Sequence, residues 1–134
     1  MNTLLVDTNV VLRFLTNDIP SQAKKVEKRF KTAQEGKISL RILPIVVIEI
    51  IFHLEHWYKF KKVDACEKIK MLFSPTWMQL DEKVAIFESL EIYKTSNIDF
   101  VDLILWCIAK KDKQKILSFD KDYDKLSPKL RTTP

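Results

Sequence analysis

Glycine, histidine and cysteine are scarce in this chain of 134 residues, which contains one glycine, two histidines and two cysteines. The single glycine, Gly36, leaves no glycine-rich phosphate loop. Cys66 and Cys107 lie far apart in apolar, helix-like settings, so we expect both to be buried free thiols. The two histidines lack the His-Glu-x-x-His order of a zinc-binding helix. The sequence therefore predicts no zinc site.

A long hydrophobic run is also missing. The longest apolar stretch, residues 42–54, contains a proline and two polar side chains and falls short of the roughly 18 residues that span a membrane. No basic segment precedes the first apolar residues, so a signal peptide is not expected. With 46% hydrophobic and 31% charged residues, the composition predicts one globular domain over residues 1–134. We expect a cytoplasmic protein without a membrane contact.

Positive charge is in excess, with 23 Lys and Arg against 18 Asp and Glu and a net charge of +5. A basic domain favours an anionic partner, most commonly nucleic acid, although a solvated lysine surface without a partner is the alternative. The candidate phosphate contacts lie on a helix predicted over residues 21–34 and in a basic connection near residue 60. They are Lys24, Lys25, Lys28, Arg29, Lys61 and Lys62.

Two predicted strands end in an aspartate. Residues 3–6 are an apolar run typical of a strand buried on both faces of a parallel sheet, and Asp7 ends it before a helix. The same pattern recurs in residues 115–119, which Asp120 ends. If the two strands are parallel neighbours, both carboxylates project into one crevice at the carboxyl edge of the sheet. Each aspartate alone is also a good cap for the helix that follows it.

The remaining pattern alternates between helices and short strands. Helical periodicity covers residues 21–34, 44–58, 63–73, 81–93 and 100–110, and strands are expected at residues 38–42, half-exposed, and 76–80. This order predicts an α/β fold, with a central parallel sheet of four to five short strands flanked by helices.

Two further acids lie where apolar side chains are expected. Glu49 shares a helix face with Ile45, Ile48 and Phe52, and Asp102 shares one with Leu105. A buried carboxylate normally protonates, pairs or binds a metal. The alternatives are that Asp102 belongs only to a helix cap and that Glu49 points to water.

If these four carboxylates converge, they form an oxygen-rich site that suits Mg²⁺ or Mn²⁺. Such a site can activate water and stabilise displacement at a phosphodiester. Thr8, Asn9 and Ser118 are placed to orient water or the acids.

The motifs Val6-Asp7-Thr8-Asn9-Val10-Val11-Leu12, Ile48-Glu49-Ile50-Ile51, Asp99-Phe100-Val101-Asp102-Leu103 and Leu117-Ser118-Phe119-Asp120, in this order, resemble a PIN-domain protein. In size the chain resembles the VapC-type ribonuclease toxins. Ser118 replaces the threonine common in the family, and Trp106 and Cys107 replace small residues. Asp99 and Asp122 are candidate auxiliary acids, with capping and solvent exposure as their alternatives.

The resemblance implies a three-layer α/β sandwich and an Mg²⁺- or Mn²⁺-dependent ribonuclease whose metal-binding acids are Asp7, Glu49, Asp102 and Asp120. It also implies a small antitoxin protein that covers the site, and a homodimer. The rival interpretation is a PIN-like module that binds RNA or protein without cleavage.

Overall fold

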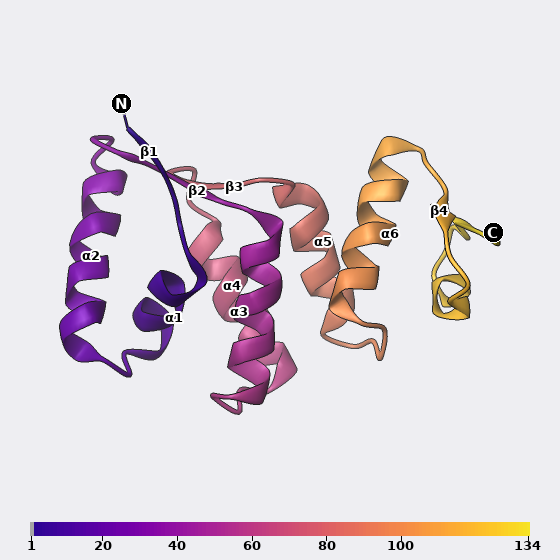
Figure 1. Ribbon diagram of the computed structural model, residues 1–134, viewed down its shortest axis with the longest axis horizontal. Coiled ribbons are helices and arrows are strands. Elements are labelled where there is room, and N and C mark those ends of the chain that lie inside the picture. The colour runs from indigo at the N-terminus through magenta and orange to yellow at the C-terminus, as the bar shows by residue number, and fades with distance from the viewer. Residues whose placement is uncertain (1) are drawn as a thin grey trace. The chain divides into compact units, whose positions relative to one another are not determined.

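A computed structural model describes residues 2–134 of the chain, which divides into two compact units, Met1–Asp81 and Glu82–Pro134. We call them unit 1 and unit 2 and describe each by itself. Over the described residues the fold is α/β, as predicted, with six α-helices and five short strands that are all paired in parallel (Figure 1). No helix in residues 2–134 is long and apolar enough to cross a membrane.

Unit 1 is a parallel sheet with two helix-containing crossovers. Its strands are β1 (Thr3–Leu5), β2 (Ser39–Ile42) and β3 (Met78–Leu80), in the order β1-β2-β3. The first crossover contains α1 (Thr8–Thr16) and α2 (Pro20–Gln34), and the second contains α3 (Pro44–His56) and α4 (Lys62–Phe73). Prolines begin α2 and α3, where the missing N–H costs no helix hydrogen bond.

Two expectations about strand burial in unit 1 are wrong. Residues 3–6 are predicted to be buried on both faces. Val6 is buried, but β1 is exposed along its length because it is an edge strand whose partner in unit 1 is β2. The segment at residues 38–42 was expected to be half-exposed. Ser39, Leu40 and Ile42 are all buried there because β2 is the central strand, with a neighbour on each side.

The core of unit 1 is built from one apolar face of each helix. Val11, Val47, Leu54 and Phe73 are fully buried, and Phe14 of α1 packs on Phe30 of α2 with ring centroids 4.9 Å apart. Buried apolar area of this kind is the main stabilising term in a small fold. It fixes α1 and α2 as a packed pair.

Unit 2 contains α5 (Lys83–Tyr93), α6 (Phe100–Asp112), β4 (Ile116–Leu117), the 3₁₀ helix η1 (Lys121–Lys125) and β5 (Arg131–Thr132). β4 pairs with β5, so the five strands form a three-stranded and a two-stranded sheet. Ala85, Trp106, Cys107 and Tyr123 form a buried cluster, and the indole N–H of Trp106 donates to the Pro128 carbonyl at 3.1 Å. The side chains at positions 106 and 107 therefore belong to the core of unit 2.

Candidate functional site

Asp7 lies at the strand-to-helix turn that the sequence predicts. Val6 is buried, and Asp7 follows it with extended backbone and caps α1 by accepting a 2.8 Å hydrogen bond from the Thr8 N–H. The Asp7 side chain is exposed, as is Asn9 on the first turn of α1. The carboxylate is thus held by the helix start and is open to a ligand.

Asn9 opens a shallow depression between α1 and α2. Its volume is about 240 Å³, and its lining residues are Asn9, Val10, Arg13, Gln22, Lys25 and Val26. Arg13 is held by the Gln22 side chain at 2.9 Å and by Asp18 at 3.4 Å. Asp18 also accepts 2.7 Å and 3.0 Å hydrogen bonds from the hydroxyls of Tyr58 and Thr16, and the Tyr58 bond is the main reason that its pKa is lowered.

Glu49 is exposed, so the expectation that it lies in the buried stripe of its helix is wrong. The buried stripe of α3 consists of Val47, Ile50, Ile51 and Leu54. The Glu49 side chain is 55% exposed and lies 3.5 Å from Nε2 of His53, one turn along the helix. Ile45 and Phe52, taken as its buried neighbours, are themselves 64% and 51% exposed. The apolar residues of α3 surround the helix, so periodicity did not reveal the buried side.

Asp102 lies on the first turn of α6 and is half-buried. Asp99 caps the same helix by accepting a 2.9 Å hydrogen bond from the Val101 N–H. Asp102 does not serve as this cap. Instead, its Oδ1 accepts a 3.1 Å hydrogen bond from the hydroxyl of Tyr123, a buried residue of η1. A tertiary contact therefore fixes the Asp102 carboxylate.

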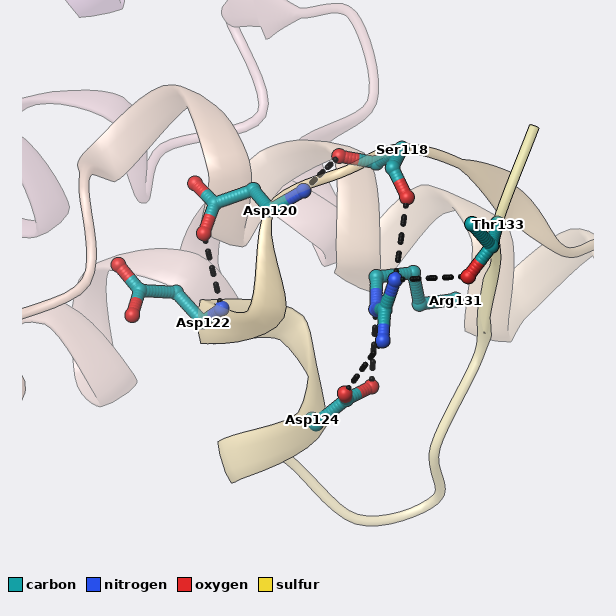
Figure 2. A network of polar contacts seen from close by, with 6 residues as sticks. All are labelled: Ser118, Asp120, Asp122, Asp124, Arg131 and Thr133. Carbon is teal, nitrogen blue, oxygen red and sulfur yellow. Dashed lines mark hydrogen bonds and ion pairs between the residues drawn. The ribbon is translucent and has the colours of Figure 1, made fainter.

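Asp120 lies just beyond β4 and caps η1. Its Oδ1 accepts a 2.8 Å hydrogen bond from the Asp122 N–H, and its own N–H donates to the Ser118 hydroxyl at 2.9 Å (Figure 2). Ser118 is anchored in turn, because Arg131 donates to its carbonyl at 3.3 Å and makes two hydrogen bonds with Asp124, at 3.2 and 2.8 Å. Ser118 and Arg131 thus fix the backbone that presents Asp120.

The acids of unit 2 share one electrostatic environment. Burial is the main cause of a raised pKa at Asp102, and the negative charges of Asp99, Asp120 and Asp122 raise it further. The hydrogen bond from Tyr123 opposes this shift by favouring the ionised carboxylate. Lys125 offsets part of the negative charge through a 2.9 Å ion pair with Asp122. Unit 2 consequently concentrates negative charge around a half-buried carboxylate, which a cation would stabilise.

The four predicted metal-binding acids are divided between the units. Asp7 and Glu49 belong to unit 1, and Asp102 and Asp120 to unit 2. Within either unit, over residues 2–134, no three His, Cys, Asp or Glu side chains are arranged to hold a metal ion. The donor chemistry nevertheless suits Mg²⁺ or Mn²⁺, because all four ligands would be carboxylate oxygens and neighbouring negative charges raise the pKa of Asp102.

The candidate phosphate contacts lie on two helices of unit 1. Lys24, Lys25, Lys28 and Arg29 are exposed on α2, whereas Lys61 precedes α4 and Lys62 is its first, half-buried residue. The basic face predicted for residues 21–34 is therefore present on the surface.

Sequence reasoning did not assign roles to Tyr123 and Arg131. Tyr123 sits three residues after Asp120 in η1, and Arg131 lies in a strand of only two residues. Tyr123 contacts Asp102, 21 positions away in the chain, so the local sequence carries no signal for this contact. The Arg131 contacts likewise depend on chain folding.

Comparison with known proteins agrees with the motifs. The PIN domain profile matches residues 4–128, a range that runs through both units. The chain is 27% identical over 123 residues to a protein described as a VapC ribonuclease from Aquifex aeolicus (strain VF5), covering 91% of this chain and 90% of the relative. No solved structure matches the chain significantly.

Proposed function

This chain belongs to the PIN-domain family, and on that premise we propose that it is a divalent-metal-dependent ribonuclease, the toxin of a type II toxin-antitoxin pair. The observation that carries the proposal is the similarity to a VapC ribonuclease, which extends over 91% of the chain and 90% of the relative. The PIN domain match, over residues 4–128, includes every candidate acid from Asp7 to Asp120. We also propose that units 1 and 2 act as a single domain.

The proposed metal-binding acids are Asp7, Glu49, Asp102 and Asp120. Their oxygens would hold Mg²⁺ or Mn²⁺, which, when bound, supplies positive charge that lowers the pKa of water and stabilises charge at a phosphodiester. Asp102 and Asp120 lie in a region of concentrated negative charge. Loading a cation there would offset the repulsion that raises the Asp102 pKa.

The neighbouring residues position these acids. Tyr123 donates to Asp102, while the Ser118 hydroxyl accepts from the backbone N–H of Asp120. Thr8 donates its backbone N–H to Asp7, and Asn9 is exposed beside it for water or substrate. Asp99 and Asp122 contribute negative charge to the same region of unit 2, and Asp99 also caps the start of α6.

RNA is the proposed substrate and a small antitoxin protein the proposed inhibitor, in a cytoplasmic homodimer. The net charge of +5 supports a polyanionic substrate. The basic residues proposed to contact RNA phosphates lie in unit 1; they are Lys24, Lys25, Lys28, Arg29, Lys61 and Lys62. Growth arrest on expression of the chain, absent for Asp7→Asn, is the expected cellular result.

The decisive experiment assays the purified chain on small RNAs with Mn²⁺ and with excess chelator. Cleavage should require the metal, and Asp7→Asn or Asp120→Asn should lower its rate on the order of 100-fold or more, the scale for removing a group that stabilises a transition state. Asp64→Asn, an exposed acid of α4 outside the proposed site, is the matched control and should cleave normally. Chelator-resistant cleavage, or an unchanged rate in Asp7→Asn, would contradict the proposal.

RNA binding without cleavage in any metal would favour the rival, a PIN-like binding module. Metal binding is tested separately by thermal unfolding. A free metal concentration of 100 times the Kd stabilises the folded state by about 2.7 kcal/mol. Mn²⁺ should therefore raise the Tm of the wild-type chain, and the rise should disappear in Asp102→Asn.

A further inference from the structure

The outer face of α2 is a strip of positive charge. Ala23, Phe30 and Ala33 are buried and define the inner side of the helix. Lys25, Lys28 and Arg29 follow one another at the spacing of helix neighbours and are all exposed. Together with Thr32 they line a shallow depression of about 360 Å³. This depression on the surface of α2 is therefore lined mainly by basic side chains.

No ion pair joins Lys25, Lys28 or Arg29 to an acidic side chain within residues 2–134. Several other cations are paired, as Arg41 is with Asp81 at 2.6 Å and Arg131 with Asp124 at 2.8 Å. Three adjacent cations that are not paired with an acidic side chain repel one another, and a bound anion would relieve that repulsion.

The second basic region of unit 1 differs in this respect. Lys59, Lys61 and Lys68 line a depression of about 620 Å³, but Asp64 and Glu67 line it too. The mixed charge makes this surface a poorer site for a polyanion. The structure thereby distinguishes two regions that the sequence treats alike.

The depression on α2 continues toward Asp7. Lys25 lines it and also lines the 240 Å³ depression that begins at Asn9, two residues after Asp7. Arg13, which lines the depression at Asn9, is already held by Asp18 and Gln22. Lys25 lines both depressions and has no ion pair within residues 2–134, so it joins the region of the candidate catalytic acid to the basic face of α2.

We propose that Lys25, Lys28 and Arg29 form a phosphate track along which the substrate RNA leaves the vicinity of Asp7, with its sugar-phosphate backbone lying against α2. This inference rests on the proposed function and adds the path of the substrate. Neither described lining includes an aromatic ring on which a base would stack. The track consequently reads the backbone and carries no base preference.

The size of the track limits the number of phosphates that it holds. Residues 25–29 span about 6 Å of helix axis at 1.5 Å per residue. A nucleic acid strand rises about 3.4 Å per nucleotide, so about two phosphates lie within reach. RNA too short to extend beyond the scissile region should not contact it.

The test is binding of a fluorescein-labelled single-stranded oligouridine in chelator, followed by anisotropy over a range of salt concentrations. The triple variant Lys25→Gln, Lys28→Gln, Arg29→Gln keeps good helix formers on an exposed face and should unfold like the wild type. Because each lost contact to a single strand flattens the plot of log K against log salt by about 0.7, a loss of about 1.4 is expected. The matched control, Lys37→Gln, Lys59→Gln, Lys68→Gln, removes the same charge from exposed positions outside the proposed RNA contacts and should change the slope less.

If both triple variants weaken binding equally, general charge explains the binding and the track is overturned. The track is also overturned if the α2 variant does not weaken binding. A second readout uses cleavage in Mn²⁺: the α2 variant should raise KM for long RNA and leave the shortest cleavable RNA unaffected. Asp7-dependent cleavage with an unchanged KM for long RNA would reject the track and leave the ribonuclease intact. Track-dependent binding without any cleavage would support the track and reject the ribonuclease.

Discussion

The Tyr123 hydroxyl donates a 3.1 Å hydrogen bond to Oδ1 of Asp102 and connects η1 to the first turn of α6 across 21 positions of the chain. Burial raises the pKa of both groups, but the bond acts on them in opposite directions. It stabilises the ionised carboxylate, which lowers the Asp102 pKa, and it raises the pKa of Tyr123. The hydrogen bond thus favours the ionised form of a candidate metal ligand in a negatively charged region.

Tyr123→Phe should therefore raise the Asp102 pKa further. The variant keeps the buried ring and loses the hydrogen bond, so we expect a stability loss of about 1 kcal/mol. Carboxyl ¹³C NMR titration in chelator measures the first effect, and the urea midpoint at an unchanged m-value measures the second. Tyr58→Phe, which removes a hydrogen bond to Asp18 in unit 1, is the control and should leave Asp102 unaffected. An unchanged Asp102 titration in Tyr123→Phe would contradict the assigned bond.

Asp102 should destabilise the metal-free protein at neutral pH. Its folded pKa is raised above the ordinary value of 3.8. The folded state therefore binds a proton that the unfolded state has lost, and stability falls as the pH rises from 3.8 through the raised value. Asp102→Asn removes this penalty and still accepts from Tyr123. We expect it to be more stable in chelator at pH 7, by up to about 1 kcal/mol, with the difference vanishing in acid. Denaturation of both proteins across this pH range is the measurement, and a less stable Asp102→Asn at pH 7 would contradict it.

The elements that local chemistry determines were predicted from the sequence. The Asp7 turn follows from an apolar run that ends in capping residues, and α2 and α4 begin within one residue of the predicted starts because their periodicity is clear. The ends of α3 and α6 are displaced by two residues, at His56 and Asp112, since fraying helix ends carry little signal.

Features that depend on distant contacts were not predicted. The two-residue strand β5 exists because it pairs with β4, and it has no propensity signal of its own. Glu49 was misplaced because α3 has apolar residues on every side. The Tyr123 contact with Asp102 joins two elements and leaves no trace in either local pattern. Candidate acids could thus be named from the sequence, while their environments could not.

The Arg131 and Asp124 pair should make unit 2 sensitive to acid. Hydrogen bonds from Arg131 hold the Asp124 pKa below its ordinary value of 3.8. The contribution of this carboxylate to stability is therefore present above pH 3.8 and is lost as the pH falls through the lowered value. Asp124→Asn should lack that acid-dependent loss and should speed hydrogen exchange of the Ser118 amide, which bonds to Thr132 of β5. Asp112→Asn is the control. Identical acid unfolding of wild type and Asp124→Asn would contradict the role of the pair.

Trp106 should be a principal support of unit 2. Its indole is 3% exposed, packs with Tyr123 and Cys107, and donates to the Pro128 carbonyl. Trp106→Ala should cost about 3–5 kcal/mol through the cavity that it leaves. That is a large part of the 5–15 kcal/mol typical of a domain. Urea unfolding measures the loss, with Trp57→Ala as the control, because Trp57 is 71% exposed.

The reactivity of the Cys107 thiol measures how closed the same core is. Burial raises its pKa to about 11, and its side chain is 1% exposed, so the thiol should resist a disulfide reagent at pH 8 in the native protein. In Trp106→Ala the cavity beside Cys107 should make labelling faster, while Trp57→Ala should label at the wild-type rate. Rapid labelling of Cys107 in the native wild-type protein would show that this core is open. It would also contradict the packing that holds Tyr123 against Asp102.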